Sequence, residues 1–185
     1  MKAPMTTATI IEGCRRGERR FQRELVDRFS PRLYAIALRY MPDAAHAKDV
    51  LQDSLVKIFT RIEQYKGTGS FEGWMRQVLI STALSKLDRK WMRREVCTET
   101  MYLDSSVAPR ALDHLSADDI LACVSQLPEG YRQVFNLYAI EGYRHREVAQ
   151  MMGITEATSR THYARARALL REVLTSPKFG LRHAK

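Results

Sequence analysis

The sequence predicts an all-α protein with two small helical domains joined by a flexible acidic linker. Apolar residues recur at spacings of three and four in both halves of the chain, and no segment shows the strict alternation of a half-buried strand. Two segments rich in Lys and Arg flank an acidic one. The middle of the acidic segment, roughly residues 97–113, includes the run Asp104-Ser105-Ser106-Val107-Ala108-Pro109, has no helical stripe and is typical of a linker.

Length and composition exclude several classes of protein. The 185 residues, 45% hydrophobic and 28% charged, have the composition of a globular protein with one domain or two small ones. No apolar run approaches the roughly 18 residues of a membrane span, so no membrane insertion is expected. The N-terminus lacks a signal peptide's apolar core, which predicts a cytoplasmic protein. Cys14, Cys97 and Cys123 lie far apart, which argues against disulfides or a zinc site.

The charge distribution indicates the kind of partner. The formal net charge is +9. Residues 1–94 hold 19 Lys and Arg against 10 Asp and Glu, residues 95–127 hold one against six, and residues 128–185 hold 10 against five. Such an excess favours nucleic acid or another anionic surface as partner. We predict domains at 1–94 and 117–185 with a linker at 95–116, the alternative being one domain with an acidic loop.

The first domain is predicted to be a helical bundle. Its first amphipathic helix is marked by Phe21, Leu25, Phe29, Leu33, Ile36 and Tyr40. Pro31 should kink or restart that helix, and Pro42 with Asp43 should end it. A second helix carries Leu51, Leu55, Ile58 and Ile62, and a turn at 66–70 leads to a third helix from Phe71 to about residue 88.

The second domain has the pattern of a helix-turn-helix. Pro128 stands at a predicted helix start, and Gly142 ends the apolar face that follows. A short helix over 144–152 stops at Gly153, and Thr155 is a good N-cap for a longer basic helix that runs to about Leu174. A short helix, a turn with Gly and a long basic helix together predict a DNA-binding motif.

The long basic helix offers side chains that can read bases. A recognition helix places its N-terminal residues against base edges in the major groove. Here Arg160, Thr161, Ala164 and Arg165 fall on one face, with donors for guanine or phosphate and small apolar groups for thymine methyls. Arg167 and Arg171 would continue toward the backbone, and Arg144, a poor cap, could reach a phosphate. The alternative is an Arg-rich helix that simply faces solvent.

The first domain offers two further candidate surfaces. Aromatic residues lie among basic ones, a pattern suited to stacking unpaired bases, although on composition alone Phe71 and Trp74 are more typical of core residues than of stacking platforms. Asp49, Gln52 and Asp53 share a helix face that is either simply solvated or an acidic docking surface for a basic partner. A third hypothesis makes His46, Asp49 and Asp53 metal ligands of a hydrolase.

Two long stretches resemble the extracytoplasmic-function sigma factors of bacterial RNA polymerase. The stretch AAHAKDVLQDSLVKIFTRIEQYKGTGSFEGWMRQVLISTALSKLDRK resembles their region two, and VSQLPEGYRQVFNLYAIEGYRHREVAQMMGITEATSRTHYARARALLREVL resembles their region four. This resemblance implies a sigma factor that binds core RNA polymerase and directs promoter-specific initiation, without catalysis, cofactor or metal of its own. The alternative is a stand-alone helix-turn-helix regulator, which would bind duplex DNA as a dimer on a palindrome.

The resemblance also implies site residues. Asp49, Gln52 and Asp53 match the pattern that docks on the β′ coiled coil of the polymerase. The residues implied to capture an extruded base of the −10 element and to hold its non-template strand are Tyr65, Lys66, Ser70, Phe71, Trp74, Arg76, Gln77, Ser81, Lys86 and Arg89. Those implied for the −35 element are Arg144, Thr155, Thr158, Arg160, Thr161, Ala164, Arg165 and Arg167.

The resemblance further implies partners and a location. The partners are core RNA polymerase, through its β′ coiled coil and β flap, promoter DNA as a −35 duplex and a melted −10 strand, and an anti-sigma factor. The protein is expected in the cytoplasm, at the nucleoid when active or held at the membrane by the anti-sigma factor. The sequence departs from the family's usual residues at Arg144, Ala157 and Ser159, and at Ser81 and Ser85 of the third helix.

Overall fold

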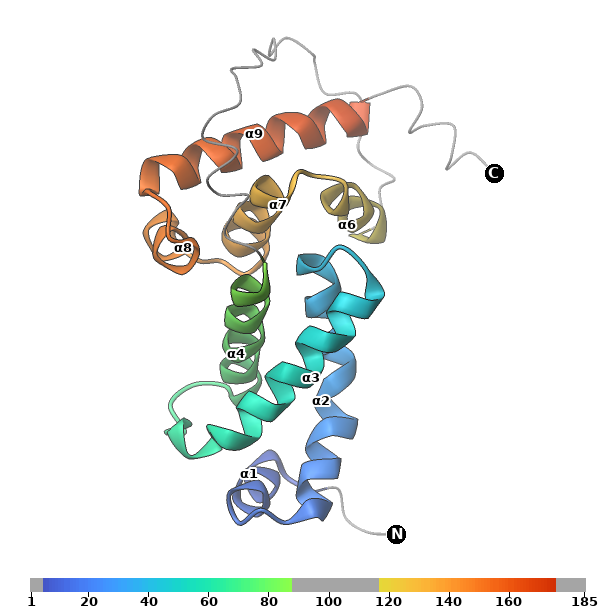
Figure 1. Ribbon diagram of the computed structural model, residues 1–185, viewed down its shortest axis with the longest axis vertical. Coiled ribbons are helices and arrows are strands. Elements are labelled where there is room, and N and C mark those ends of the chain that lie inside the picture. Colours follow the sequence, from blue (N-terminus) through green and yellow to red (C-terminus); the bar gives the residue numbers. More distant parts are fainter. Residues whose placement is uncertain (1–4, 88–116, 176–185) are drawn as a thin grey trace, which may run out of the picture. The chain divides into compact units, whose positions relative to one another are not determined.

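The computed structural model describes residues 5–87 and 117–175, and all the regular structure in these ranges is helical (Figure 1). The chain divides into two compact units, Met1–Leu87 and Asp88–Lys185. The all-α prediction is therefore confirmed for the described residues. The expected linker at 95–116 and the candidate residue Arg89 lie outside them.

The first unit begins with a helix that we did not predict from the sequence. Helix α1 (Thr7–Arg15) starts where the Thr6 hydroxyl accepts a hydrogen bond from the Thr9 amide at 3.2 Å. It packs on α2 (Arg19–Tyr40) so closely that a Cβ built at Gly13 would lie 2.2 Å from ring atoms of Phe21. A residue without a side chain is thus required where the two helices meet.

Helix α2 continues through Pro31 without a restart. Proline in a helix interior costs about 3 kcal/mol, because it removes a hydrogen bond and crowds the preceding turn. The buried stripe of α2 nevertheless extends past Pro31, from Leu25 and Phe29 to Leu33 and Ala37. Burial of apolar residues on both sides of the proline offsets its cost, since each fully buried side chain contributes about 1.5–3 kcal/mol.

Helices α3 (Ala44–Thr60) and α4 (Phe71–Lys86) complete the first unit and pack on α2 and on each other (Figure 1). Asp43 caps α3 by accepting a hydrogen bond from the His46 amide at 2.9 Å, and Ser70 caps α4 by accepting from the Gly73 amide at 3.3 Å. The short helix η1 (Ile62–Gln64) follows α3. The predicted end of the first amphipathic helix, just before Pro42, is confirmed.

The second unit contains α6 (Ala117–Ser125), α7 (Glu129–Phe135), η3 (Asn136–Ile140), α8 (His145–Met152) and α9 (Glu156–Thr175). One hydrophobic cluster joins α6 to α9; its buried members are Cys123, Val124, Leu127, Ala166 and Leu170. Gly153, in the left-handed conformation at φ 67°, ends α8 as predicted. The π-helical geometry of η3 was not predicted.

Within the described ranges, no helix combines the length and the apolar character that crossing a bilayer requires.

Candidate nucleic-acid and polymerase interface

The outward face of α9 carries three of the predicted base-reading residues. Arg160, Thr161 and Ala164 are exposed. The opposite face of the helix is buried through Ser159, His162, Ala166 and Leu170. This division follows the helical repeat, so packing against the rest of the unit orients the three residues toward solvent.

The arginines of α9 have different neighbours. Arg160 forms an ion pair with Glu156, one turn earlier on the same helix. The guanidinium of Arg165 donates a hydrogen bond to the Tyr131 hydroxyl of α7 at 3.0 Å, so this residue lies at the flank of the exposed face. Arg167 is exposed, and its guanidinium carbon lies 5.8 Å from the centre of the Tyr163 ring.

The N-termini of α8 and α9 are positioned by different caps. The Thr155 hydroxyl accepts a hydrogen bond from the Thr158 amide at 3.0 Å, as expected of an N-cap, and lies 2.8 Å from the Thr158 hydroxyl. Arg144 precedes α8 and makes no side-chain cap; its backbone N–H instead donates to the Glu147 carboxylate at 2.7 Å. The exposed Arg144 side chain is therefore not used in capping.

An aromatic cluster that sequence reasoning missed holds the helix-turn-helix together; its members are Phe135, Tyr138, His145 and Tyr163. The His145 ring stacks on Tyr138 at a centroid distance of 4.0 Å, and Tyr163 contacts Tyr138 at 4.6 Å. Nδ1 of His145 also lies 3.0 Å from the Ser159 hydroxyl of α9. Burial lowers the pKa of His145, as does the Arg160 cation, against an opposing effect of Glu156.

In the first unit, the predicted single-strand surface has an aromatic cluster at its base. The rings of Phe71 and Trp74 stack at 5.6 Å, and Tyr65 contacts them at 5.1 Å and 5.8 Å respectively. Phe71 also meets Phe29 of α2 and is only 4% exposed, so it belongs to the core. Of the three rings in this cluster, only those of Tyr65 and Trp74 retain partial exposure and can offer surface to a ligand.

The turn between η1 and α4 is fixed by contacts within the first unit. The Tyr65 hydroxyl donates to the carbonyl of Gly69 at 2.8 Å. The guanidinium of Arg15, in α1, donates to the carbonyl of Tyr65 at 2.7 Å. Sequence reasoning missed Arg15, because the contact joins residues 50 positions apart. Lys66 in this turn, and Arg76, Gln77 and Ser81 on α4, are exposed.

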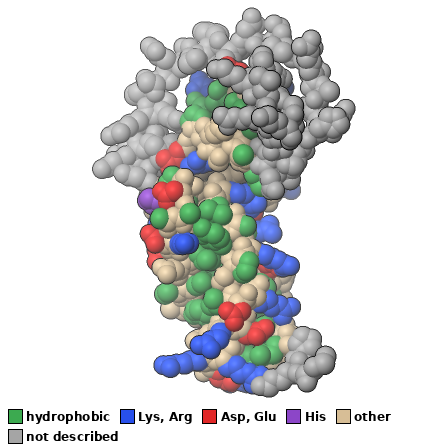
Figure 2. All heavy atoms as spheres, turned by 90° about the vertical axis from the view of Figure 1, so that its right-hand side faces the viewer, with side chains coloured by type: hydrophobic (Ala, Val, Ile, Leu, Met, Phe, Trp, Pro, Cys, Tyr) green, Lys and Arg blue, Asp and Glu red, His purple; other side chains and the backbone are tan. Residues whose placement is uncertain are grey.

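The third candidate surface lies on α3. Asp49, Gln52 and Asp53 are all exposed on one face of this helix, and Val56, at the next helical position, is 61% exposed. We call these four residues the docking face. Figure 2, which views the molecule from the right-hand side of Figure 1, shows hydrophobic side chains between basic and acidic ones on the first unit.

The metal-site hypothesis finds no support in the geometry of these residues. Nδ1 of His46 lies 2.8 Å from Asp43 Oδ2. Hydrogen bonds from His46, first from its backbone N–H, lower the pKa of Asp43. Asp53 pairs instead with Lys86, whose Nζ lies 2.7 Å from its Oδ2. Across the described residues, no three His, Cys, Asp or Glu side chains are grouped so that they could hold a metal ion.

These features define a DNA-binding protein of the helix-turn-helix class that carries a second helical unit. Residues 25–93 match the Sigma-70 region 2 family, and residues 117–170 match Sigma-70, region 4. The chain belongs to the sigma-70 family and is an RNA polymerase sigma factor of the extracytoplasmic-function type. The family prediction is confirmed, and the stand-alone regulator is disfavoured, because both regions are present in order.

Curated relatives agree with this assignment. The chain is 32% identical over 152 residues to "Probable RNA polymerase sigma factor RfaY" of Xanthomonas campestris, covering 76% of this chain but only 37% of that protein. It is 25% identical over 177 residues to the RNA polymerase sigma-H factor of Pseudomonas aeruginosa, covering 89% and 92% of the two chains. It is 28% identical over 157 residues to the ECF RNA polymerase sigma factor SigE of Mycolicibacterium smegmatis, covering 82% and 60%.

A solved structure shares the fold. It is the sigma factor RpoE from Bartonella quintana, co-crystallised with the anti-sigma factor NepR. The match has a TM-score of 0.52 and 23% identity, and it covers 85% of this chain and 98% of that one.

Proposed function

We propose that this sigma factor binds core RNA polymerase through the docking face of α3 and directs initiation by reading two promoter elements, one in each unit. The observation that carries the proposal is the exposure of candidate DNA-binding residues on two helices, α4 and α9, in separate units. The chain itself performs no catalysis, since the chemistry of RNA synthesis belongs to the polymerase.

The second unit binds the −35 element as duplex DNA. Helix α9 enters the major groove with Arg160, Thr161 and Ala164 toward base edges, where a guanidinium can bind guanine and a small apolar group can contact a thymine methyl. Thr155, Thr158 and Arg144, at the helix N-termini, contact phosphates. The same unit also contacts the β flap of the polymerase.

The first unit binds the melted −10 strand. The turn at 65–70 receives an extruded base, and Tyr65 and Trp74 offer the ring surfaces on which it stacks. The backbone of the strand follows α4, whose exposed side chains include Arg76, Gln77 and Ser81. Extrusion of a base costs a few kcal/mol, which binding at the −35 element and to polymerase offsets.

The docking face receives a basic part of the polymerase, the β′ coiled coil. The exposed carboxylates of Asp49 and Asp53 supply charge complementarity, and Val56 adds apolar contact beside them. We further propose cytoplasmic location and control by an anti-sigma factor that masks these surfaces. A fold shared with a sigma factor that was crystallised with such an inhibitor supports this last step.

In vitro transcription with core polymerase and a promoter library tests the proposal. We expect added protein to stimulate initiation at a small set of start sites that share two spaced elements. Replacing Asp53 with Ala should reduce stimulation and co-purification with core polymerase together. Protein that binds duplex DNA as tightly without polymerase, and stimulates no initiation, would contradict the proposal and favour a stand-alone regulator.

A further inference from the structure

One ion pair joins two surfaces to which different partners are assigned. Nζ of Lys86, the last residue of α4, lies 2.7 Å from Oδ2 of Asp53 on α3. Asp53 belongs to the docking face, and Lys86 belongs to the residues assigned to the −10 strand. The side chains of Asp53 and Lys86 are 52% and 37% exposed, so an external partner can still reach either of them.

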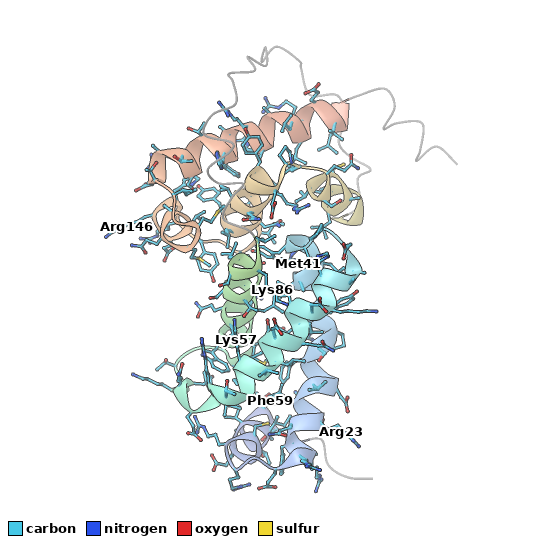
Figure 3. The ribbon with its side chains drawn as sticks, viewed as in Figure 1. Arg23, Met41, Lys57, Phe59, Lys86 and Arg146 are labelled. Atoms are coloured by element: carbon cyan, nitrogen blue, oxygen red, sulfur yellow. The ribbon has the colours of Figure 1, made fainter. Side chains whose placement is uncertain are left out.

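The packing of α3 on α4 fixes this pair. Ser54, next to Asp53, is fully buried at 0% exposure, and its hydroxyl donates to the carbonyl of Val50 within α3 at 2.6 Å. One turn along, Nζ of Lys57 donates to the Thr82 hydroxyl at 3.1 Å. Because residue 53 meets 86 and residue 57 meets 82, the two helices run antiparallel. Figure 3 labels the two lysines, Lys57 on α3 and Lys86 on α4. The ion pair is therefore held in register by tertiary structure.

We propose that the Asp53–Lys86 ion pair couples polymerase docking to capture of the −10 strand. When the Asp53 carboxylate accepts hydrogen bonds from a cation of the polymerase, it gives up part of its interaction with Lys86. The released ammonium of Lys86 is then available to a phosphate of the strand. By linkage, a phosphate bound at Lys86 raises the affinity of Asp53 for the polymerase by the same factor.

The size of the coupling follows from the exposure of the pair. Loss of a partly exposed ion pair changes the equilibrium constant for binding at either of its members by a factor of about two to five. Coupling of this size adjusts affinity and does not act as an all-or-none switch. Asp53 thus holds the Lys86 ammonium in addition to its role in docking. This inference rests on the proposed function.

The affinity of the full chain for core polymerase, measured without DNA, tests the inference. Replacement of Lys86 with Met should tighten binding to core by about two- to fivefold, because Asp53 loses its internal competitor. Lys57→Met is the matched control: it removes the same charge from the same pair of helices but leaves the Asp53–Lys86 pair intact. We expect it to change the affinity less than Lys86→Met. Thermal unfolding checks each variant, and Lys86→Gln replaces Lys86→Met if the latter is misfolded.

The double replacement separates the ion pair from a general charge effect. In an Asp53→Asn background, which itself weakens docking, Lys86→Met should no longer tighten binding to core. Unchanged or weaker binding of the Lys86 variant, or a gain that persists in the Asn background, would overturn the inference while leaving the proposed function intact. Failure of the wild-type chain to bind core polymerase would overturn both.

Discussion

Arg160 and Arg167 both present guanidinium groups on α9, but they occupy different positions. Arg160 lies near the N-terminus of the helix, and Arg167 lies two turns further along. Replacing Arg160 with Ala should weaken binding to the −35 duplex by about 1–3 kcal/mol and relax specificity at one base pair. Replacing Arg167 with Ala should weaken binding to all duplexes alike and reduce the salt dependence. Binding to a set of single-base variants of the element measures both effects.

Equal losses on every duplex for the two variants would contradict base reading by Arg160. The comparison is matched, because both changes remove one exposed cation from the same helix. A change at Glu156 alone is a separate control, because it removes the ion pair with Arg160 without removing the cation.

The buried imidazole of His162 should make the stability of the second unit depend on pH. Burial lowers the pKa of His162, and the Arg165 cation lowers it further, so the folded protein favours the neutral ring. An unfolded histidine has a pKa of about 6.5. Below that pH the unfolded state therefore binds more protons than the folded state. The free energy of unfolding consequently decreases as the pH falls from the unfolded pKa to the lower pKa of the folded state.

Urea unfolding at about pH 7.5 and about pH 5.5 measures this effect. We expect the free energy of unfolding of the second unit to be lower at the acidic pH. His162→Gln should lessen the difference, although His145, whose pKa is also lowered, retains part of it. A variant with the full pH dependence of the wild type would show that His162 is not responsible.

At the scale of elements, Gly13 allows α1 to pack closely against Phe21 of α2. Gly13→Ala would place a Cβ 2.2 Å from the Phe21 ring and should destabilise the first unit by about 1–3 kcal/mol. Gly73→Ala in α4 is the control, because its Cβ would meet Ser70 at an ordinary 3.7 Å. We expect this control to be neutral or slightly stabilising, since Ala favours a helix over Gly by about 1 kcal/mol. Thermal unfolding of the two variants distinguishes these outcomes, and equal effects would contradict the tight contact.

Most helices could be predicted because apolar spacing and caps are local features. Thr155 and Gly153 have the roles that their chemistry predicts, at the start of α9 and the end of α8. Helix α1 was missed because only two of its residues, Ile10 and Cys14, present a buried apolar side chain. The continuation of α2 past Pro31 depends on burial against α3 and α4, which no local rule contains.

At the scale of the whole molecule, the two units should contribute independently to promoter binding. Trp74→Ala should cost about 1–3 kcal/mol through lost stacking. Combined with Arg160→Ala, the two losses should add within about 0.5 kcal/mol, because the residues belong to separate units with separate ligands. The affinity of the polymerase complex for a promoter that carries a melted −10 strand measures the sum. A double variant no weaker than Trp74→Ala would show that α9 makes no separate contribution.

The candidate surfaces were predicted from residue types, but their detailed contacts were not. Exposure of Asp49, Gln52 and Asp53 agrees with the helical spacing that the sequence shows. Phe71 was proposed both as core and as a stacking surface, and its burial against Phe29 favours the core. A helical repeat identifies the apolar face but not which of its members is covered, since that depends on the neighbouring helix.

Sequence patterns were sufficient for the helical class, the two basic regions and the helix-turn-helix, because helix periodicity, capping and charge are properties of neighbouring residues. Only the tertiary structure decided that Lys86 meets Asp53, that Arg15 holds the turn at Tyr65, and that His145 stacks on Tyr138. Each of these contacts joins residues from different elements. Their distances are set by how the helices pack, and packing depends on the combined shape of many side chains.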